Sequence, residues 1–203
     1  VDSHVVDISD CMSLLNSALT NKDIKIPLGH YEDVSMKDTV VPNRNAIFSS
    51  ILYGYALSIS NQSDDKVNLS LGVHSGDHAI YPDCRPEFYK SIMESFEIGN
   101  WNTENINLYL PYINKSKAEI IEDAKLSTHK LKLDFNLIFR NTITTYSPHE
   151  NGYSDGKTGS DIERILAFDQ LGIEDPAQYT DTWDNLVKIA KSYELKNCNE
   201  IHY

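Results

Sequence analysis

The sequence has little of what a membrane, secreted or nucleic-acid-binding protein requires. Its 203 residues include no apolar stretch near the roughly 20 residues that span a bilayer, and the N-terminus lacks the charged-then-apolar pattern of a signal peptide. With 18 Lys+Arg against 30 Asp+Glu, the formal net charge is −12, so anionic membranes and nucleic-acid backbones would be repelled at long range. These absences predict a cytoplasmic protein whose main partner is neither a membrane nor a nucleic acid.

Cysteine is also scarce. Cys11, Cys84 and Cys198 are widely spaced and form no Cys-x-x-Cys pair, which argues against both a disulfide framework and a zinc site built from cysteines. We therefore expect reduced thiols. Cys84 alone lies in a segment rich in reactive side chains, where a buried structural thiol is a more common role than a nucleophile.

Hydrophobic residues make up 40% of the chain, which is sufficient for one sizeable core, so one compact domain is the default prediction. The first part of the chain predicts a buried strand over residues 4–8 and a short helix over residues 12–19. The segment 27–42 has a proline at each end and little periodicity. We interpret it as an active-site loop, with a disordered insertion as the alternative.

The middle of the chain alternates between helical and strand patterns. Apolar spacing predicts a helix at 45–60, a strand at 67–71, a helix at 86–98, a strand at 106–110 and a helix at 116–131. This order is typical of an α/β fold with a doubly wound parallel sheet, whose loops meet at the carboxyl ends of the strands. In the first helix we expect one face to be core: Ile47, Phe48, Ile51, Leu52, Tyr55, Ala56 and Ile59.

The last third of the chain has a different character. A polar loop at 144–157 precedes two predicted helices, the first of which begins at Ser160. Ser160 and Glu163 have the spacing of a capping box, in which each side chain bonds a backbone donor of the first turn. We therefore divide the chain into a Rossmann-like nucleotide-binding region, residues 1–140, and a small helical C-terminal region, residues 141–203.

Residues 72–88, between a predicted strand and a predicted helix, are the most informative segment. They include two histidines, two aspartates, an arginine, a tyrosine and a thiol. Loops at this position carry ligand contacts in α/β sheets. A solvated connector is the alternative for a loop this polar.

The order of residues in this loop resembles that of a known family. Residues 81–88 read Tyr-Pro-Asp-Cys-Arg-Pro-Glu-Phe, which closely resembles the signature of the QueC family, the 7-cyano-7-deazaguanine synthases. Residues 41–45 resemble the family's Val-Pro-Gly-Arg-Asn, residues 117–120 its Lys-Ala-Glu helix start, and residues 164–179 its C-terminal region. The resemblance covers nearly the whole chain.

The resemblance implies a PP-loop ATP pyrophosphatase fold and a reaction. ATP and Mg2+ would convert the carboxylate of 7-carboxy-7-deazaguanine, with ammonia, into the nitrile 7-cyano-7-deazaguanine through an acyl adenylate, in queuosine and deazapurine biosynthesis. It also suggests a homodimer. Two alternatives stay open: a divergent ligase that joins the deazaguanine carboxylate to another amine, and a non-catalytic nucleotide-binding subunit.

Site residues follow from the resemblance together with side-chain chemistry. Arg44 and Lys117 are the catalytic candidates, because their charges could stabilise the phosphates of ATP; without the resemblance Lys115 would serve as well as Lys117. Arg44, Asn45 and Gly72 are assigned to nucleotide binding. Substrate binding is assigned to the loop residues His74, Asp77, Tyr81, Asp83 and Arg85.

These assignments combine specific roles with structural alternatives. Asp77 and Asp83 could accept hydrogen bonds from the guanine-like base, and Tyr81 or His74 could stack on its face. An ion pair between Asp83 and Arg85 would explain those two residues almost as well. For Arg44, the alternative is a salt bridge to surface carboxylates.

Two features of the family are missing from the chain. It has no Gly-Gly pair and hence no Ser-Gly-Gly-x-Asp-Ser phosphate loop, so we expect it to be the remainder of a longer product. The family's zinc-binding cysteines correspond to Asp155, Thr158, Asp161 and the neighbourhood of Ser147, which do not supply the soft or imidazole donors of a zinc site. We predict no zinc, and a loop held by side-chain hydrogen bonds. Asn43 replaces a family glycine and can adopt the same left-handed backbone.

Overall fold

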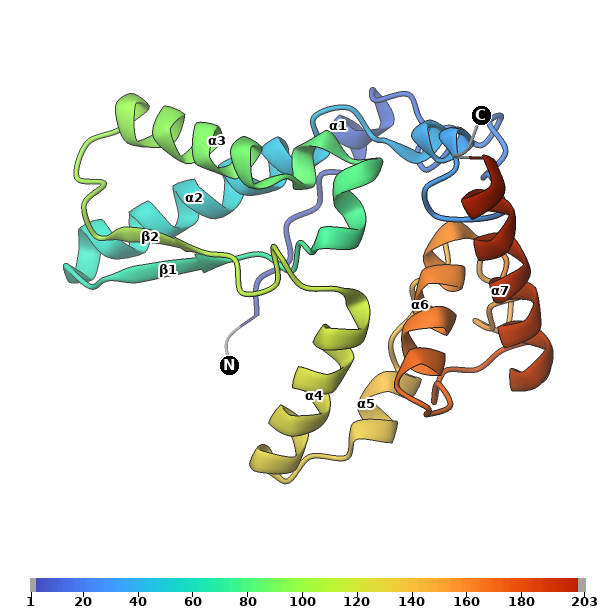
Figure 1. Ribbon diagram of the computed structural model, residues 1–203. Coiled ribbons are helices and arrows are strands. Elements are labelled where there is room, and N and C mark those ends of the chain that lie inside the picture. The colour runs from blue at the N-terminus through green and yellow to red at the C-terminus, as the bar shows by residue number, and fades with distance from the viewer. Residues whose placement is uncertain (1–2, 201–203) are drawn as a thin grey trace.

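The computed structural model describes residues 3–200, and the side chains of residues 3–196. In this part of the chain a small parallel sheet is combined with helices, which is an α/β fold (Figure 1). The elements in chain order are α1 (Ser9–Ser13), the 3-10 helix η1 (Val34–Thr39), α2 (Arg44–Ser63), β1 (Val67–Ser70), the 3-10 helices η2 (Ser75–Ala79) and η3 (Pro82–Cys84), α3 (Pro86–Gly99), β2 (Ile106–Tyr109), α4 (Lys117–Leu131), α5 (Phe135–Arg140), α6 (Gly159–Gln170) and α7 (Trp183–Glu200).

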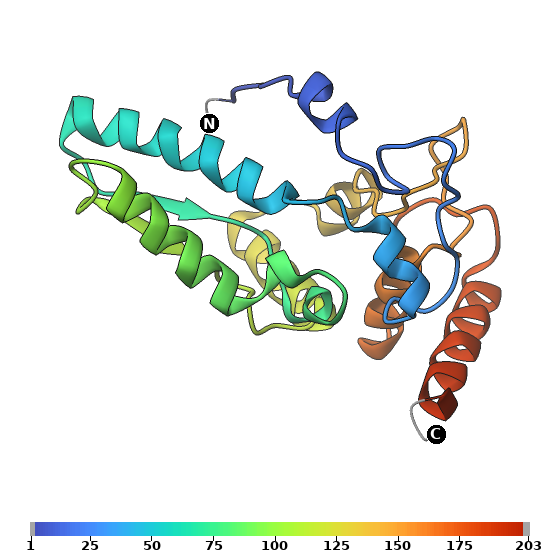
Figure 2. The same cartoon turned by 90° about the horizontal axis from the view of Figure 1, so that it is seen from above.

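The sheet pairs β1 with β2 in parallel, with Val67 opposite Ile106 and Leu69 opposite Leu108. Because side chains alternate along a strand, these four apolar residues share one face. Helices α2 and α3 lie next to one another over that face (Figures 1 and 2). Both strands and the helices at 86–98 and 116–131 are therefore confirmed. The sheet core includes Tyr53 and Ala56 of α2 and Met93 and Phe96 of α3.

Helix α2 buries only part of the predicted face. The predicted core residues Phe48, Ile51, Tyr55 and Ile59 are between 38% and 48% exposed. The prediction is confirmed for Ala56 and Leu52, which belong to or pack against the sheet core. It is wrong for the four exposed residues because apolar residues occur on several sides of the helix, so their spacing does not select one face. The buried face carries Asn45, Ser49, Tyr53, Ala56 and Ser60.

The N-terminal segment also differs from its prediction. Residues 4–8 form no strand, and Val5 and Val6 are 95% and 62% exposed. β-branched residues favour a strand only where a neighbouring strand packs against them, and none of the described residues does so here. The predicted helix at 12–19 is reduced to α1, which begins and ends earlier, and Leu14 is 84% exposed.

The segment 27–42 is irregular but ordered around η1. Its Tyr31 and Met36 are 6% and 2% exposed and belong to one hydrophobic cluster with Tyr81, Cys84 and Tyr89 of the following segments. The alternative of a disordered insertion is therefore wrong. The segment lies against the loop that follows β1.

The C-terminal helices pack on α4 and on each other. Ala118 and Ile121 of α4 contact Ala167 and Phe168 of α6, and a second cluster joins α6 to α7. The capping box of α6 is formed by Thr158, which precedes the helix, with Asp161. The prediction of Ser160 with Glu163 was wrong by two residues, because Thr158 offers the same chemistry one half-turn earlier. Within the described residues no helix has the length and apolarity to cross a bilayer.

Candidate functional site

The loops that follow the two strands meet at the carboxyl edge of the sheet, as predicted. Ser75, in the loop after β1, donates its backbone N–H and its hydroxyl to the carbonyl oxygen of Lys115 at 3.0 and 2.8 Å. A cleft of about 220 Å³ opens beside this contact, between the two loops, the segment 27–42 and α6. Its polar lining includes Tyr31, Ser75, Ser116, Lys117, Glu163 and Gln170.

Lys117 begins α4, and its ammonium forms an ion pair with Glu163 of α6. Lys115 pairs instead with Glu119 at 2.7 Å, and its side chain is 51% exposed. The structure thus separates two lysines that sequence chemistry alone left equivalent. Lys117 lines the cleft, and Lys115 belongs to an exposed pair outside it.

His74 lies between two carboxylates and is almost completely buried. Its Nε2 is 3.5 Å from Asp77 Oδ2, and its Nδ1 is 3.8 Å from Glu163 Oε1. The backbone N–H of Gly76 donates to Nδ1 at 3.1 Å, which fixes the ring. These contacts connect Asp77, His74, Glu163 and Lys117, and we call this set, with Tyr31, the cleft network.

Tyr31 completes the cleft network from the segment 27–42. Its hydroxyl donates to the Asp77 carboxylate. Burial, and then the negative charge of Asp77, raise the pKa of Tyr31 far above its usual range. Tyr31 is therefore a neutral hydrogen-bond donor at any working pH.

Tyr81 is buried next to this network and holds Arg44 beside it. Its hydroxyl lies 2.5 Å from Thr39 Oγ1 and 3.3 Å from the Tyr146 hydroxyl. The guanidinium carbon of Arg44 is 5.5 Å from the centroid of the Tyr81 ring, within cation–π range. No ion pair joins Arg44 to another described residue, so the alternative of a surface salt bridge is wrong.

Asn45 and Asp83 join the start of α2 to the loop after β1. The backbone N–H of Asn45 donates to Asp83 Oδ2 at 3.2 Å, and its side-chain amide donates to the Asp83 carbonyl oxygen at 3.1 Å and to Cys84 Sγ at 3.2 Å. Asn43, just before α2, has φ 61° and ψ 15°, which confirms the predicted left-handed backbone. Asp83 Oδ1 is buried and has no hydrogen-bond partner among the described residues.

Cys84 has the environment of a structural thiol. It is 2% exposed and belongs to the hydrophobic cluster of Tyr31 and Tyr81. Burial, reinforced by the charges of Asp77 and Asp83, raises the pKa of Cys84 to about 12. The thiolate that a nucleophile requires is therefore disfavoured.

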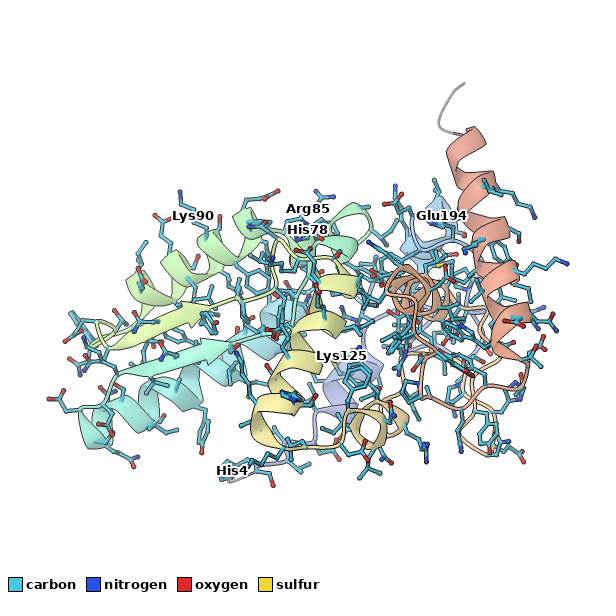
Figure 3. The ribbon with its side chains drawn as sticks, turned by 60° about the horizontal axis from the view of Figure 1, so that its bottom comes forward. His4, His78, Arg85, Lys90, Lys125 and Glu194 are labelled. Atoms are coloured by element: carbon cyan, nitrogen blue, oxygen red, sulfur yellow. The ribbon has the colours of Figure 1, made fainter. Side chains whose placement is uncertain are left out.

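The two remaining predicted site residues, Arg85 and Gly72, are also outside the cleft network. Nε of Arg85 donates to the carbonyl oxygen of His78 at 2.8 Å, and Figure 3 shows the two residues next to one another near the beginning of α3. No ion pair joins Arg85 to Asp83 among the described residues, so that alternative is also wrong. Gly72 follows β1 on the exposed surface, and a Cβ there would meet no atom within 4 Å.

Two of the residues predicted to replace zinc ligands, Thr158 and Asp161, form a hydrogen-bonded cap at the start of α6. Thr158 Oγ1 donates to Asp161 Oδ2 at 2.5 Å, and both residues are almost fully buried. Ser160 Oγ donates to the carbonyl oxygen of Thr144 at 2.7 Å, which ties the loop to α6. Asp155 instead accepts from the backbone N–H of Lys157 at 3.1 Å. The side-chain oxygens of Thr158 and Asp161 thus form a hydrogen bond with each other.

Four residues of this region were not assigned from the sequence: Tyr31, Thr39, Tyr146 and Glu163. The first two lie in the segment 27–42, whose interpretation as an active-site loop was the only available signal. Tyr146 lies in a polar loop and Glu163 was interpreted as a cap. Only the packing of the segments against each other identifies these side chains.

Known proteins resemble this chain in sequence. The family model described as queuosine biosynthesis protein QueC matches residues 1–172. The chain is 42% identical over 180 residues to a 7-cyano-7-deazaguanine synthase of Marinomonas sp. (strain MWYL1), covering 88% of this chain and 74% of that protein. It is 41% identical over 179 residues to 7-cyano-7-deazaguanine synthase 1 of Colwellia psychrerythraea, with 88% and 74% covered. No solved structure matches. The chain belongs to the QueC family.

Proposed function

We propose that this chain converts 7-carboxy-7-deazaguanine, ammonia and ATP into 7-cyano-7-deazaguanine. The relatives named above carry the name of this activity. The observation that supports it most directly is the cleft at the carboxyl edge of the sheet, where Lys117 and Glu163 form an ion pair beside Tyr31. Ligands of α/β folds bind at this edge.

Arg44 and Lys117 are the proposed contacts to the phosphates. Arg44 has a guanidinium without an ionic partner among the described residues, and its planar fork can bind two phosphate oxygens at once. Lys117 is placed at the N-terminus of α4, where the helix dipole also favours an anion. Gly72 would leave room for the nucleotide beside the strand. Asn45 would act by holding Asp83 and Cys84 in place.

The loop after β1 is the proposed site of the deazaguanine. Among the described residues, Asp83 Oδ1 is a buried acceptor without a donor, which suits the N–H donors of a guanine-like base. Asp77 would accept a hydrogen bond from the same edge of the base, and the rings of His74 and Tyr81 would lie against the face of the base. Arg85 would contribute a substrate contact from the outer side of the loop.

The proposed chemistry activates a poor electrophile. A carboxylate oxygen of the substrate attacks the α-phosphorus of ATP and releases pyrophosphate, which gives an acyl adenylate. Ammonia attacks the acyl carbon, and AMP leaves to give an amide. A second ATP activates the amide oxygen in the same way, and loss of AMP and protons gives the nitrile. Arg44 and Lys117 would stabilise the charge that develops on the phosphates.

Metal requirements follow from the available donors. The described residues contain no group of three or more His, Cys, Asp or Glu side chains placed to hold a metal. We propose that Mg2+ binds mainly through the ATP phosphates and water, as is usual for this ion. A structural zinc does not fit at Thr158 and Asp161, because their oxygens bond each other and are not soft donors.

We also propose that β1 and β2 belong to a doubly wound sheet in a region spanning residues 1–140, with residues 141–203 as a helical C-terminal region. The parallel pairing and the crossover through α3 support this arrangement. A homodimer and a cytoplasmic location remain predictions. Three exposed leucines on and after α4 support self-association: Leu126, Leu131 and Leu133. Analytical ultracentrifugation would test it.

The decisive experiment measures AMP and product with the native full-length protein. Given ATP, Mg2+, the carboxylic acid and 15N-ammonium, it should release AMP and form a nitrile that carries the label. Lys117→Ala should lower the rate by about 100-fold or more, as for loss of a transition-state contact, whereas the matched control Lys115→Ala should not. Product with an unlabelled amine would indicate the divergent ligase. ATP binding without AMP release would indicate the non-catalytic subunit.

A further inference from the structure

Glu163 occupies a central position in the cleft that no part of the reaction above requires. One carboxylate oxygen pairs with the Lys117 ammonium, and the other lies 3.8 Å from Nδ1 of His74. The side chain is 17% exposed. Glu163 is thus the residue through which α6 reaches both the proposed phosphate contact on α4 and the base-binding loop after β1.

Capping does not explain this carboxylate. The capping box of α6 is satisfied by Thr158 and Asp161, so Glu163 is not needed for the first turn of its helix. The opposite wall of the cleft, at Gly76, leaves space for the Glu163 carboxylate. A Cβ on Gly76 would lie 2.1 Å from Glu163 Oε1 and 2.9 Å from the His74 ring, so a larger residue there would displace the carboxylate from this position.

We propose that Glu163 is a positioning residue that acts through Lys117. A lysine side chain has four rotatable bonds and, without a partner, would sample many positions at the rim of the cleft. The Glu163 carboxylate holds the ammonium where the phosphates arrive, so that little reorganisation remains when charge develops. The same negative charge repels the phosphates in the ground state. Glu163 therefore favours turnover over tight binding of ATP. This inference rests on the proposed role of Lys117.

The opposing effects on turnover and binding give a specific signature. Glu163→Gln keeps the shape of the side chain but removes its charge, so kcat should fall by about 10–100-fold, as for other residues that orient a catalytic group. The KM for ATP should fall or stay constant, because a repulsive charge is gone. Asp169→Asn is the matched control, since it removes a carboxylate of the same helix from an exposed pair with Lys191 at 2.8 Å. It should change neither value.

A double-mutant cycle tests whether Glu163 acts through Lys117. If it does, Glu163→Gln should have almost no further effect on kcat in a protein that already carries Lys117→Ala. Glu163→Asp, which keeps the charge but shortens the reach, should lose turnover without tightening ATP binding. Multiplicative losses in the double variant would overturn the proposal, as would a Glu163→Gln protein with the kcat of the Asp169→Asn control.

A second readout is independent of the reaction. In the folded protein without ligand, an amine-directed reagent should modify Lys117 several-fold faster in Glu163→Gln than in the wild type, as measured by peptide mass spectrometry, and Lys115 should be unchanged. Equal labelling of Lys117 would overturn the proposed pairing even if the enzyme is active. If Lys117 is labelled faster in Glu163→Gln but the protein releases no AMP, the Glu163–Lys117 pairing is supported and the proposed function is refuted.

Discussion

Replacing Arg164 with alanine should cost about 3–5 kcal/mol of unfolding free energy, because it would leave the Asp175 carboxylate buried without its counter-ion. Both residues are 4% exposed. The guanidinium binds the carboxylate through two bonds, from Nε to Oδ2 and from Nη2 to Oδ1, the second at 2.8 Å. Such forked geometry is specific to arginine, so lysine would not restore it.

The surroundings of the pair make its loss more costly. The remaining N–H groups of Arg164 donate to Thr142 and to the Phe139 carbonyl oxygen, at 2.9 to 3.3 Å. Asp175 also accepts from the Tyr179 hydroxyl at 2.7 Å and from a backbone N–H. The pair thus joins α5, α6 and the loop before α7. Truncating one partner would leave several buried polar groups without hydrogen bonds.

Urea denaturation of three variants tests this reasoning. Arg164→Ala should lower the denaturation midpoint strongly, and the double variant Arg164→Met with Asp175→Leu should lose less stability than Arg164→Ala, because no charge is left buried. Lys191→Ala, which breaks an exposed pair with Asp169, should cost at most about 1 kcal/mol. The reasoning is refuted if Arg164→Ala is as mild as Lys191→Ala, or if the double variant is the least stable.

Three more results are expected. At about pH 8, iodoacetamide should modify the exposed Cys11 and spare Cys84 in the folded protein. The pKa of Cys84 is raised to about 12, so only about one Cys84 side chain in 10⁴ is a thiolate at that pH. Equal labelling of the two cysteines in peptide mass spectra would contradict this. Asn43→Val should lower the unfolding free energy by roughly 1–2 kcal/mol because φ is 61°, whereas Asn43→Gly should be tolerated in the same denaturation assay. Dialysis against a chelator should leave the melting temperature unchanged, because Thr158 and Asp161 bond each other; a drop in Tm would indicate a structural metal.

The central fold could be predicted from the sequence because its pattern and its environment agree. The apolar residues of β1 and β2 alternate, and the helix signals of α3 and α4 begin at Pro86 and at the Ser116 cap. Each of these elements has a neighbour that covers its apolar face. Local propensity and tertiary packing then favour the same structure.

Prediction failed where a partner decides the outcome. Residues 4–8 have strand propensity but no strand beside them among the described residues, so Val5 and Val6 remain exposed. Helix α2 has apolar residues on several sides, and only contact with the sheet selects the face that carries Tyr53 and Ala56. Neither contact is encoded in local periodicity.

The candidate site shows the same division. Arg44, His74, Asp77, Tyr81, Asp83 and Lys117 could be chosen because their local motifs are recognisable. Their partners could not, since Tyr31 lies 46 residues from Asp77 and Glu163 lies 46 residues from Lys117. Contacts of this range depend on how whole segments pack. The sequence therefore indicates the chemistry of the cleft but not the pairs that orient it.

The cap of α6 connects these long-range pairs to one another. Leu28 forms an isolated bridge with Thr158, and the N–H of Gly29 donates to the carbonyl oxygen of Lys157 at 3.1 Å, so the segment that carries Tyr31 is fastened to the start of the helix that carries Glu163. Thr158 is fully buried, and its hydroxyl bonds Asp161 and Ser160. Because buried hydrogen bonds of this kind fix a single geometry, they can orient two walls of the cleft without a metal ion. Thr158 and Lys157 therefore hold the segment of Tyr31 against the helix of Glu163, although neither of them lines the cleft.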